Sequence, residues 1–226
     1  MAFDPQNFDQ GQPVNLPSEL NLPILAIRNT VIFPVLAFPI NVGREKSLEA
    51  VERALAGDKL LGIVAQQDAK NEDPEVSELY TTGTVVKILK WLKQPGNKLN
   101  VIIQGLARIK IERWDQTSPC LAAKVKVFEE STESTPELES LMGNMRDLAQ
   151  KVIELSPQIQ PEASFVVRSV DNPGILADIV ASNLNIGVEE KQDLLETLET
   201  KERMTKVISL LNKEIQVLEL SNKIQT

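Results

Sequence analysis

The stretch that decides the fold runs from Thr84 to Arg113 and reads TVVKILKWLKQPGNKLNVIIQGLARIKIER. Two runs rich in Val, Ile and Leu, Thr84–Lys93 and Leu99–Arg113, flank a Gln-Pro-Gly-Asn-Lys cluster that is typical of a turn. Because β-branched residues favour strands, this pattern predicts an antiparallel hairpin. Gly105 stands inside the second run, where a glycine indicates a bulge or a sharp bend.

Further strands are expected on both sides of this hairpin. Val35–Val42 is apolar but follows Pro34 and contains Pro39, so it is expected to form an edge or bulged strand, or a packed extended loop, because proline cannot donate to a β-ladder. Arg44–Ala56 has helical spacing of its apolar residues. The remaining predicted strands are Leu22–Ile27, Leu60–Ala65 and Leu121–Glu129.

The period of the apolar residues changes after Ser131. Thr135 is a good helix N-cap and Pro136 suits the first helical position. A three-four stripe follows, which predicts a helix packed on its neighbours rather than a free-standing coiled coil: Leu138, Leu141, Met145, Leu148, Val152 and Leu155. Three more helices are predicted: one from Asn172 to about Leu184, one over Val188–Leu198, and one from about Lys201 to the end of the chain. The expected fold class is therefore α+β, with a flexible leader over 1–21, a β-rich part over 22–130 and a helical part over 131–226.

The composition excludes several classes of protein. The 226 residues are 42% hydrophobic and 25% charged, which is ordinary for a folded domain. Histidine is absent and Cys120 is the single cysteine, so neither a Ser-His or Cys-His pair nor a site built from His or several Cys ligands is available. Cys120 is expected to serve packing. Neither a signal peptide nor an apolar run long enough to cross a membrane is present, which favours a soluble intracellular protein.

The charge is distributed unevenly along the chain. The formal net charge is −8, which argues against bulk attraction to nucleic acid or anionic lipid. Residues 84–127 nevertheless carry nine Lys and Arg against Glu112 and Asp115, a local charge of +7. Alternation such as Arg108, Ile109, Lys110 predicts that much of this charge lies on the solvated face of a half-buried sheet.

Several segments, in order along the chain, resemble the N-terminal domain of Lon, the ATP-dependent protease. They are Leu22–Arg28, Phe33-Pro34, Pro39, Val42–Arg44 with Ser47, Thr82–Val85, Val101–Arg108, Leu176–Ser182 and Glu190–Glu196. Gln104 stands where the family pattern has Glu. The resemblance covers about residues 22–226 and leaves the leader unmatched.

This resemblance implies a PUA-like six-stranded β pseudo-barrel, followed by a helical bundle that ends in a long helix. Full-length Lon also has an ATPase module, which binds ATP and Mg²⁺ through a Gly-x-x-x-x-Gly-Lys-Ser/Thr loop, and a protease module with a Ser-Lys dyad. No such loop occurs in this sequence, so no cofactor is expected for this chain and no catalytic residue is assigned. The chain stops in a predicted helix at Ser221–Thr226, which favours a fragment over a stand-alone protein. The lack of an Arg-rich presequence favours the bacterial cytoplasm.

The function implied by the resemblance is capture of unfolded or damaged polypeptides for degradation. This task needs exposed apolar surface that tolerates many sequences. The candidate side chains lie around the two prolines: Phe33, Val35, Leu36 and Phe38. The structural alternative is that they cover the open end of the barrel.

Two other functions remain open at this point. The last predicted helix carries a second apolar stripe opposite its docking stripe, which suggests an interface with a neighbouring subunit or with the rest of a longer chain: Leu210, Val217, Leu220 and Ile224. An oligomerisation or scaffold role would use this stripe. The basic stretch with Trp91 and Trp114 suggests RNA binding, which the acidic total disfavours.

Overall fold

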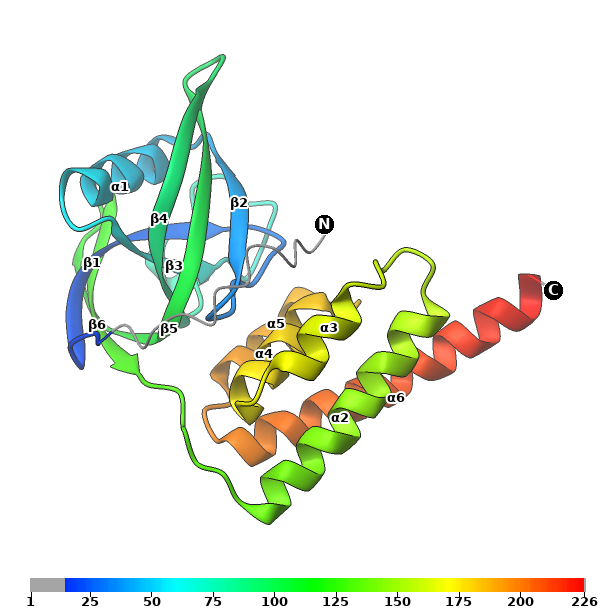
Figure 1. The fold of residues 1–226 in the computed structure, drawn as a ribbon. Coiled ribbons are helices and arrows are strands. Elements are labelled where there is room, and N and C mark those ends of the chain that lie inside the picture. Colours follow the sequence, from blue (N-terminus) through cyan, green and yellow to red (C-terminus); the bar gives the residue numbers. More distant parts are fainter. Residues whose placement is uncertain (1–14, 226) are drawn as a thin grey trace. The chain divides into compact units, whose positions relative to one another are not determined.

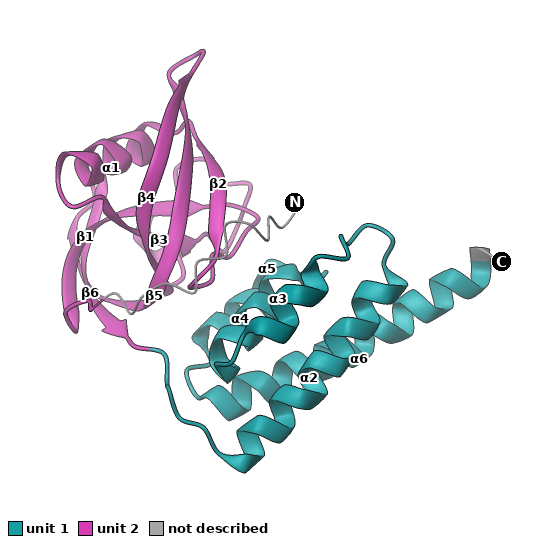
Figure 2. Cartoon of the chain, in the orientation of Figure 1, with its two compact units in different colours: residues 1–9, 130–226 teal, residues 10–129 magenta. Residues whose placement is uncertain are grey.

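The computed structural model describes residues 15–225 of the chain. Two compact units are present, a β unit (Gln10–Glu129) and a helical unit (Glu130–Thr226), shown in different colours in Figure 2. Among the described residues, six strands, one α-helix and one short 3-10 helix lie in the first unit and five α-helices lie in the second, which confirms the predicted α+β class.

The β unit is a mixed six-stranded sheet that closes into a ring (Figure 1). The strand order is β2-β5-β4-β3-β1-β6, and pairing of β5 with β6 completes the ring. β1 and β3 are parallel, and all other neighbours are antiparallel. The strands are β1 (Glu19–Ile27), β2 (Ala37–Val42), β3 (Leu60–Ala65), β4 (Thr82–Gln94), β5 (Lys98–Gln116) and β6 (Leu121–Phe128).

The predicted hairpin is formed by β4 and β5 and is irregular at two points. Next to Gly105 the register slips so that Leu106 is an extra residue on β5, and this confirms the predicted bulge. A second slip makes Leu89 an extra residue on β4. β2 pairs with β5 alone, so the edge strand predicted from Pro39 is also confirmed.

The predicted leader over 1–21 is corrected at its C-terminal end. Residues 1–14 lie outside the described part of the chain, but Glu19–Asn21 already belongs to β1 and pairs with Lys124–Lys126 of β6. The polar residues Glu19 and Asn21 face water while Leu20 packs against the core, which is the alternation of a half-buried strand.

The core of the β unit consists of two apolar clusters. One cluster lies under α1 (Glu45–Ala56), and this helix contributes Ala50, Val51 and Ala54 to it. Cys120 is a member of the same cluster. Burial of Cys120 confirms its expected packing role. The other cluster gathers inward residues of β1, β4, β5 and β6.

The polar connector between β3 and β4 is ordered by side chains from within the β unit. Buried Gln66 donates from Nε2 to the carbonyl oxygens of Asp68 and Asn71, and Arg44 donates to the Gln66 side chain and to the Ala26 carbonyl. The connector ends in a short 3-10 helix, η2 (Val76–Glu78).

The helical unit contains α2 (Pro136–Leu155), α3 (Ala163–Ser169), α4 (Pro173–Asn183), α5 (Val188–Glu196) and α6 (Thr200–Gln225). The predicted caps are present, because the side chain of Thr135 accepts from the Leu138 amide at 3.2 Å and that of Asn172 accepts from the Ile175 amide at 3.0 Å. α3 was not predicted, since seven residues are too few to reveal a helical period.

Packing of α2 against α6 forms the long side of the helical unit, and α4 contacts both helices (Figure 1). The buried face of α2 differs slightly from the predicted stripe. Met142 and Ala149 are buried, whereas Leu141 and Leu148 are only half-buried. The face of α2 that packs against the other helices is therefore shifted by one sequence position, from Leu141 and Leu148 to Met142 and Ala149.

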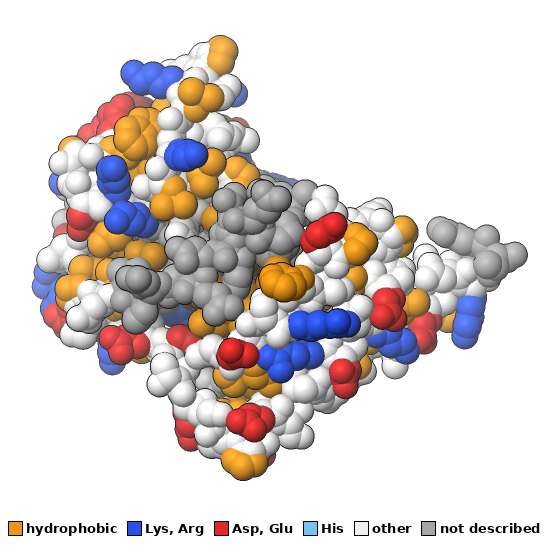
Figure 3. Space-filling view, in the orientation of Figure 1, with side chains coloured by type: hydrophobic (Ala, Val, Ile, Leu, Met, Phe, Trp, Pro, Cys, Tyr) orange, Lys and Arg blue, Asp and Glu red, His pale blue; other side chains and the backbone are white. Residues whose placement is uncertain are grey.

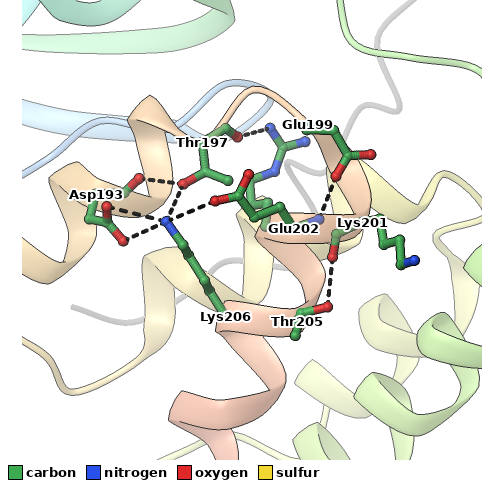
Figure 4. A network of polar contacts seen from close by, with 8 residues as sticks. Asp193, Thr197, Glu199, Lys201, Glu202, Thr205 and Lys206 are labelled. Carbon is green, nitrogen blue, oxygen red and sulfur yellow. Dashed lines mark hydrogen bonds and ion pairs between the residues drawn. The ribbon is translucent and has the colours of Figure 1, made fainter.

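A polar network joins α5 to the start of α6 (Figure 4). The Lys206 ammonium donates to Asp193 at 3.0 Å and to the Thr197 hydroxyl at 3.0 Å. Glu199 caps α6 by accepting from the Glu202 amide at 2.7 Å. The network therefore fixes the direction in which α6 leaves α5.

Arg203 lies at the centre of the helical unit with 1% of its surface exposed. Its Nε lies 3.3 Å from Oδ1 of Asp178, which is equally buried, and its Nη2 lies 2.6 Å from Oε1 of Glu130. Nη1 donates to the carbonyl of Thr197 at 3.2 Å. One guanidinium thus joins α4, α6 and the segments that precede α2 and α6.

Candidate functional site

Neither a cluster of metal ligands nor a membrane-spanning helix is found among the described residues. No group of three or more Asp, Glu or Cys side chains within residues 15–225 is placed to hold a metal ion. No helix in that range is both long and apolar enough to cross a membrane.

The predicted polypeptide-binding segment forms a tight turn, and the structure corrects the exposure of two of its four residues. Phe33 is completely buried and Leu36 is 6% exposed, so neither side chain presents a surface in this fold. Val35 and Phe38 are half-buried, and Phe38 packs against the cluster under α1. Pairing with Gly105 draws the segment inward, because the Val35 amide donates to the Gly105 carbonyl and the Gly105 amide donates to the Leu36 carbonyl, both at 2.9 Å.

Val35 holds a backbone conformation that is unfavourable for a β-branched residue, with φ at 76° after Pro34. Glycine adopts this conformation without steric cost. We expect Val35→Gly to raise the free energy of unfolding of the β unit by about 1 kcal/mol relative to Val35→Ala, which removes the same methyl groups but keeps most of the strain. Urea unfolding monitored by tryptophan fluorescence measures this difference, and equal stability of the two variants would contradict it.

The large apolar side chains that are most exposed in the described β unit lie on the outer half of the β4–β5 hairpin, here called the arm (residues 88–103). Its members are Leu89 (44% exposed), Trp91 (46%), Leu92 (65%) and Ile102 (36%), and they are here called the arm patch. Ile102 stands opposite Lys90 of β4 and, on its other side, opposite the exposed Pro39 of β2. The arm projects from the ring in Figure 1, and Figure 3 shows apolar and basic side chains intermingled over it.

Lysines surround the arm patch. Lys87, Lys90, Lys93 and Lys98 are exposed, and none of them forms an ion pair with another residue in the described range. The Lys59 ammonium lies 5.7 Å from the centre of the Trp91 ring, within cation-π range. The arm is thus both apolar and positively charged.

Sequence reasoning missed the arm patch, although a signal was present. A strand with one wet face alternates polar and apolar residues. The run Lys87-Ile88-Leu89-Lys90-Trp91-Leu92-Lys93 does not, since two apolar residues follow each of the first two lysines. Such a pattern places apolar side chains on both faces of a hairpin that has a core on only one.

The two tryptophans behind the RNA-binding alternative lie apart. Trp91 stands opposite Val101 near the start of β5, whereas Trp114 lies near its other end opposite Ala123. Trp114 is half-buried and packs against the second core cluster. The pair therefore does not form one stacking platform.

The predicted helix-interface residues are exposed over the last turns of α6. Val217 is 65% exposed, Leu220 61% and Ile224 84%, while Leu210 is half-buried. Beside them Lys151 of α2 contacts Glu219 at 2.6 Å, and this ion pair lowers the pKa of Glu219. An interface role for the four residues stays a prediction.

The displaced pKa values of the helical unit have structural causes. Burial lowers the pKa of Lys191, whose ammonium donates to the Ser182 carbonyl at 2.8 Å. Burial likewise raises the pKa of Glu214. In the network of Figure 4, the hydrogen bond to Asp193 raises the pKa of Lys206. The shifts thus reflect burial for Lys191 and Glu214 and a local hydrogen bond for Lys206.

Comparison with known proteins gives a consistent result. The family described as ATP-dependent protease La (LON) substrate-binding domain matches residues 21–213. The Lon protease of Dictyoglomus thermophilum is 44% identical over 204 residues, which are 90% of this chain and 26% of that protein. The Lon protease of Anaeromyxobacter dehalogenans is 42% identical over 206 residues, or 91% of this chain and 24% of that protein. The chain thus spans about a quarter of the length of these curated relatives.

Solved structures with the same fold include the N-terminal domain of a Mycobacterium avium complex Lon protease, with a TM-score of 0.70 and 22% identity over 85% of this chain and 98% of that one. A Lon N-terminal domain protein from Xanthomonas campestris has a TM-score of 0.60 and 16% identity over 84% and 98%. At these identities the likeness establishes the fold alone.

Proposed function

This chain belongs to the Lon substrate-binding domain family, and from this premise we propose that it is a non-catalytic receptor that captures unfolded or damaged polypeptides for degradation by an ATP-dependent Lon protease. ATP, Mg²⁺ and the hydrolytic Ser-Lys dyad would then act in other parts of such a protease. We place this activity in the bacterial cytoplasm, in line with the bacterial relatives.

The observation that carries the proposal is the arm patch. Folded proteins keep their apolar side chains inside, so a receptor that distinguishes unfolded from folded chains needs apolar surface of its own. Leu89 and Leu92 are exposed on a strand that is anchored to the ring through β5, so they can be covered without rearrangement of the core. Their aliphatic chains make non-directional contacts that tolerate many sequences.

A second function, assembly with neighbouring subunits or with the rest of a longer chain, is supported by a separate observation. The exposed residues Val217, Leu220 and Ile224 recur at intervals of three and four along α6 and so lie on one side of the helix. This surface belongs to the helical unit, so it can be tested independently of the arm.

The test of capture measures binding of the 226-residue chain to a fluorescent protein that reduction and carboxamidomethylation keep unfolded, and to the same protein folded. We expect the unfolded form alone to bind, with a weaker dependence on salt than RNA binding would show and with no dependence on Mg-ATP. Equally tight binding of the folded and the unfolded protein would contradict the proposal. Binding to RNA alone, with strong salt dependence, would favour the nucleic-acid alternative instead.

Variants of the arm patch localise the binding. We expect Leu89→Ser combined with Leu92→Ser to weaken capture by about thirtyfold, because two exposed aliphatic contacts of the order of 1 kcal/mol each are removed. Leu198→Ser is the matched control, since Leu198 is 47% exposed in the helical unit. Equal loss in both variants would show that the arm has no special part in capture.

A further inference from the structure

The outer half of β4 has one free hydrogen-bonding edge. β3 pairs with Thr84–Lys87, and the Ile88 amide still donates to the Lys59 carbonyl at 2.9 Å. Beyond this point Leu89 is the bulged residue and Lys90–Gln94 pairs with β5 on one side, while no described residue pairs with Leu89–Gln94 on the other side. Backbone donors and acceptors along this edge are therefore available to an added strand.

The second strand with a free edge, β2, is less suited to accept an added strand than the outer half of β4. β2 also has a single neighbour, but Pro39 in its middle has no amide to donate. Within the described sheet β1, β3 and β6 each have two neighbours, and β5 pairs with β2, β4 and β6. Leu89–Gln94 contains no proline, so it is the part of the described sheet best suited to accept a strand.

Side chains beside this edge match an apolar partner. Leu89, Trp91 and Leu92 are each between 44% and 65% exposed and lie on the same six-residue stretch as the open backbone. A strand placed here would cover them with its own side chains, since cross-strand neighbours lie about 5 Å apart. Main-chain hydrogen bonds would supply affinity that does not depend on sequence.

The positive charge around the free edge of β4 favours partner strands that carry acidic residues. No Asp or Glu occurs from Leu79 to Ile111, and Lys87, Lys90, Lys93 and Lys98 have no ion-pair partners in the described range. Asp58, whose carboxylate accepts from the Leu60 amide at 3.1 Å, is the acidic neighbour of Lys59. Two copies of this edge would bring lysines together, which disfavours self-pairing. An acidic strand would instead find opposite charges.

We propose that an extended segment of unfolded polypeptide in which apolar and acidic residues alternate adds to Leu89–Gln94 as a further strand of the sheet. The inference rests on the proposed function and specifies how capture occurs and which substrates are preferred. An extended polypeptide fits this edge better than RNA does, because the arm patch is mostly aliphatic and the edge offers strand-pairing groups.

Three synthetic nine-residue peptides test the charge preference on the whole chain. In each peptide Val alternates with one polar residue, which is Glu, Ser or Lys. We expect affinity to fall in that order, with the Glu peptide binding on the order of tenfold more tightly than the Lys peptide at low salt. Equal affinity for the three peptides would overturn the charge preference.

Backbone amide hydrogen exchange measured by NMR tests strand addition directly. We expect alternate amides within Leu89–Gln94 to exchange on the order of tenfold more slowly in the complex with the Glu peptide, since only every second amide of a strand points to the open edge. If the unfolded protein is captured while these amides stay unprotected, strand addition is wrong and the proposed function stands. If neither the unfolded protein nor any peptide binds, the proposed function itself fails.

Charge reversal on the arm gives the matched variants. Lys90→Glu combined with Lys93→Glu should remove most of the difference in affinity between the three peptides, since Lys87 and Lys98 then face two glutamates, whereas Lys70→Glu, an exposed lysine of the β3–β4 connector, should leave the difference unchanged. The same shift in all variants would contradict a site at β4. Salt-dependent binding of a single-stranded RNA that displaces the Glu peptide without amide protection would also overturn strand addition.

Discussion

Arg203→Ala is expected to lower the free energy of unfolding of the helical unit by about 3–5 kcal/mol, because it leaves the buried carboxyl group of Asp178 without its guanidinium neighbour. The same change removes the contacts with Glu130 and with the Thr197 carbonyl. Few single substitutions in this chain are expected to cost more. The loss of Arg203 also leaves a cavity between α4 and α6, which adds to the electrostatic cost.

The location of the tryptophans makes this effect measurable unit by unit. Both tryptophans, Trp91 and Trp114, lie in the β unit, so fluorescence reports unfolding of that unit alone, while far-ultraviolet circular dichroism reports mainly the helices. Arg203→Ala should shift the urea midpoint of the second signal far more than that of the first. A shift worth less than about 1 kcal/mol would contradict the central role of Arg203.

Two control variants separate charge from packing in this prediction. Arg168→Ala removes an exposed arginine of α3 and should change stability by no more than about 0.5 kcal/mol. Arg203→Met combined with Asp178→Leu removes both buried charges and should recover much of the stability that Arg203→Ala loses. If the double variant is no more stable than Arg203→Ala, the loss is due to the missing volume and not to the loss of the guanidinium beside Asp178.

Gly105→Ala is expected to destabilise the β unit by about 3 kcal/mol. A Cβ at this position would lie far inside van der Waals contact with the Phe33 carbonyl oxygen and 3.0 Å from Cα of Pro34. Both neighbours are backbone atoms, so the clash cannot be relieved by a side-chain rotation. The turn at Phe33–Leu36 must move away, and its two hydrogen bonds with residue 105 weaken.

Tryptophan fluorescence during urea unfolding should record this loss, with the circular dichroism signal of the helices little changed. Gly43→Ala is the matched control in the same unit, because its added Cβ meets the Lys98 side chain at an ordinary 3.5 Å. If the two variants are equally stable, close packing of Gly105 against the turn does not contribute to the fold.

Burial of Phe33 also changes how the binding site is to be tested. Phe33→Ala would empty a fully buried position and cost on the order of 3–5 kcal/mol, so loss of capture in that variant would report unfolding. Serine substitutions in the arm patch avoid this confusion, since Leu89 and Leu92 are exposed before any partner binds.

The local signals in the sequence were sufficient for most of the secondary structure. The predicted range of β3, the caps Thr135 and Asn172, and the edge position of β2 all follow from residues close together in the chain, and all are present. The order of motifs also indicated the family that the comparisons support. Such features depend on backbone propensity, on a missing amide or on a short hydrogen bond, which are properties of a few neighbouring residues.

The tertiary structure alone decided which apolar residues are exposed. Phe33 and Leu92 are both large and apolar, yet one is covered because Gly105 draws its turn inward and the other is exposed because β4 extends past the end of β3. Likewise, nothing near Arg203 in the sequence indicates that Asp178 and Glu130 enclose it. Burial depends on partners that are distant in the chain, and a periodic pattern records only that a face is apolar, not what covers it.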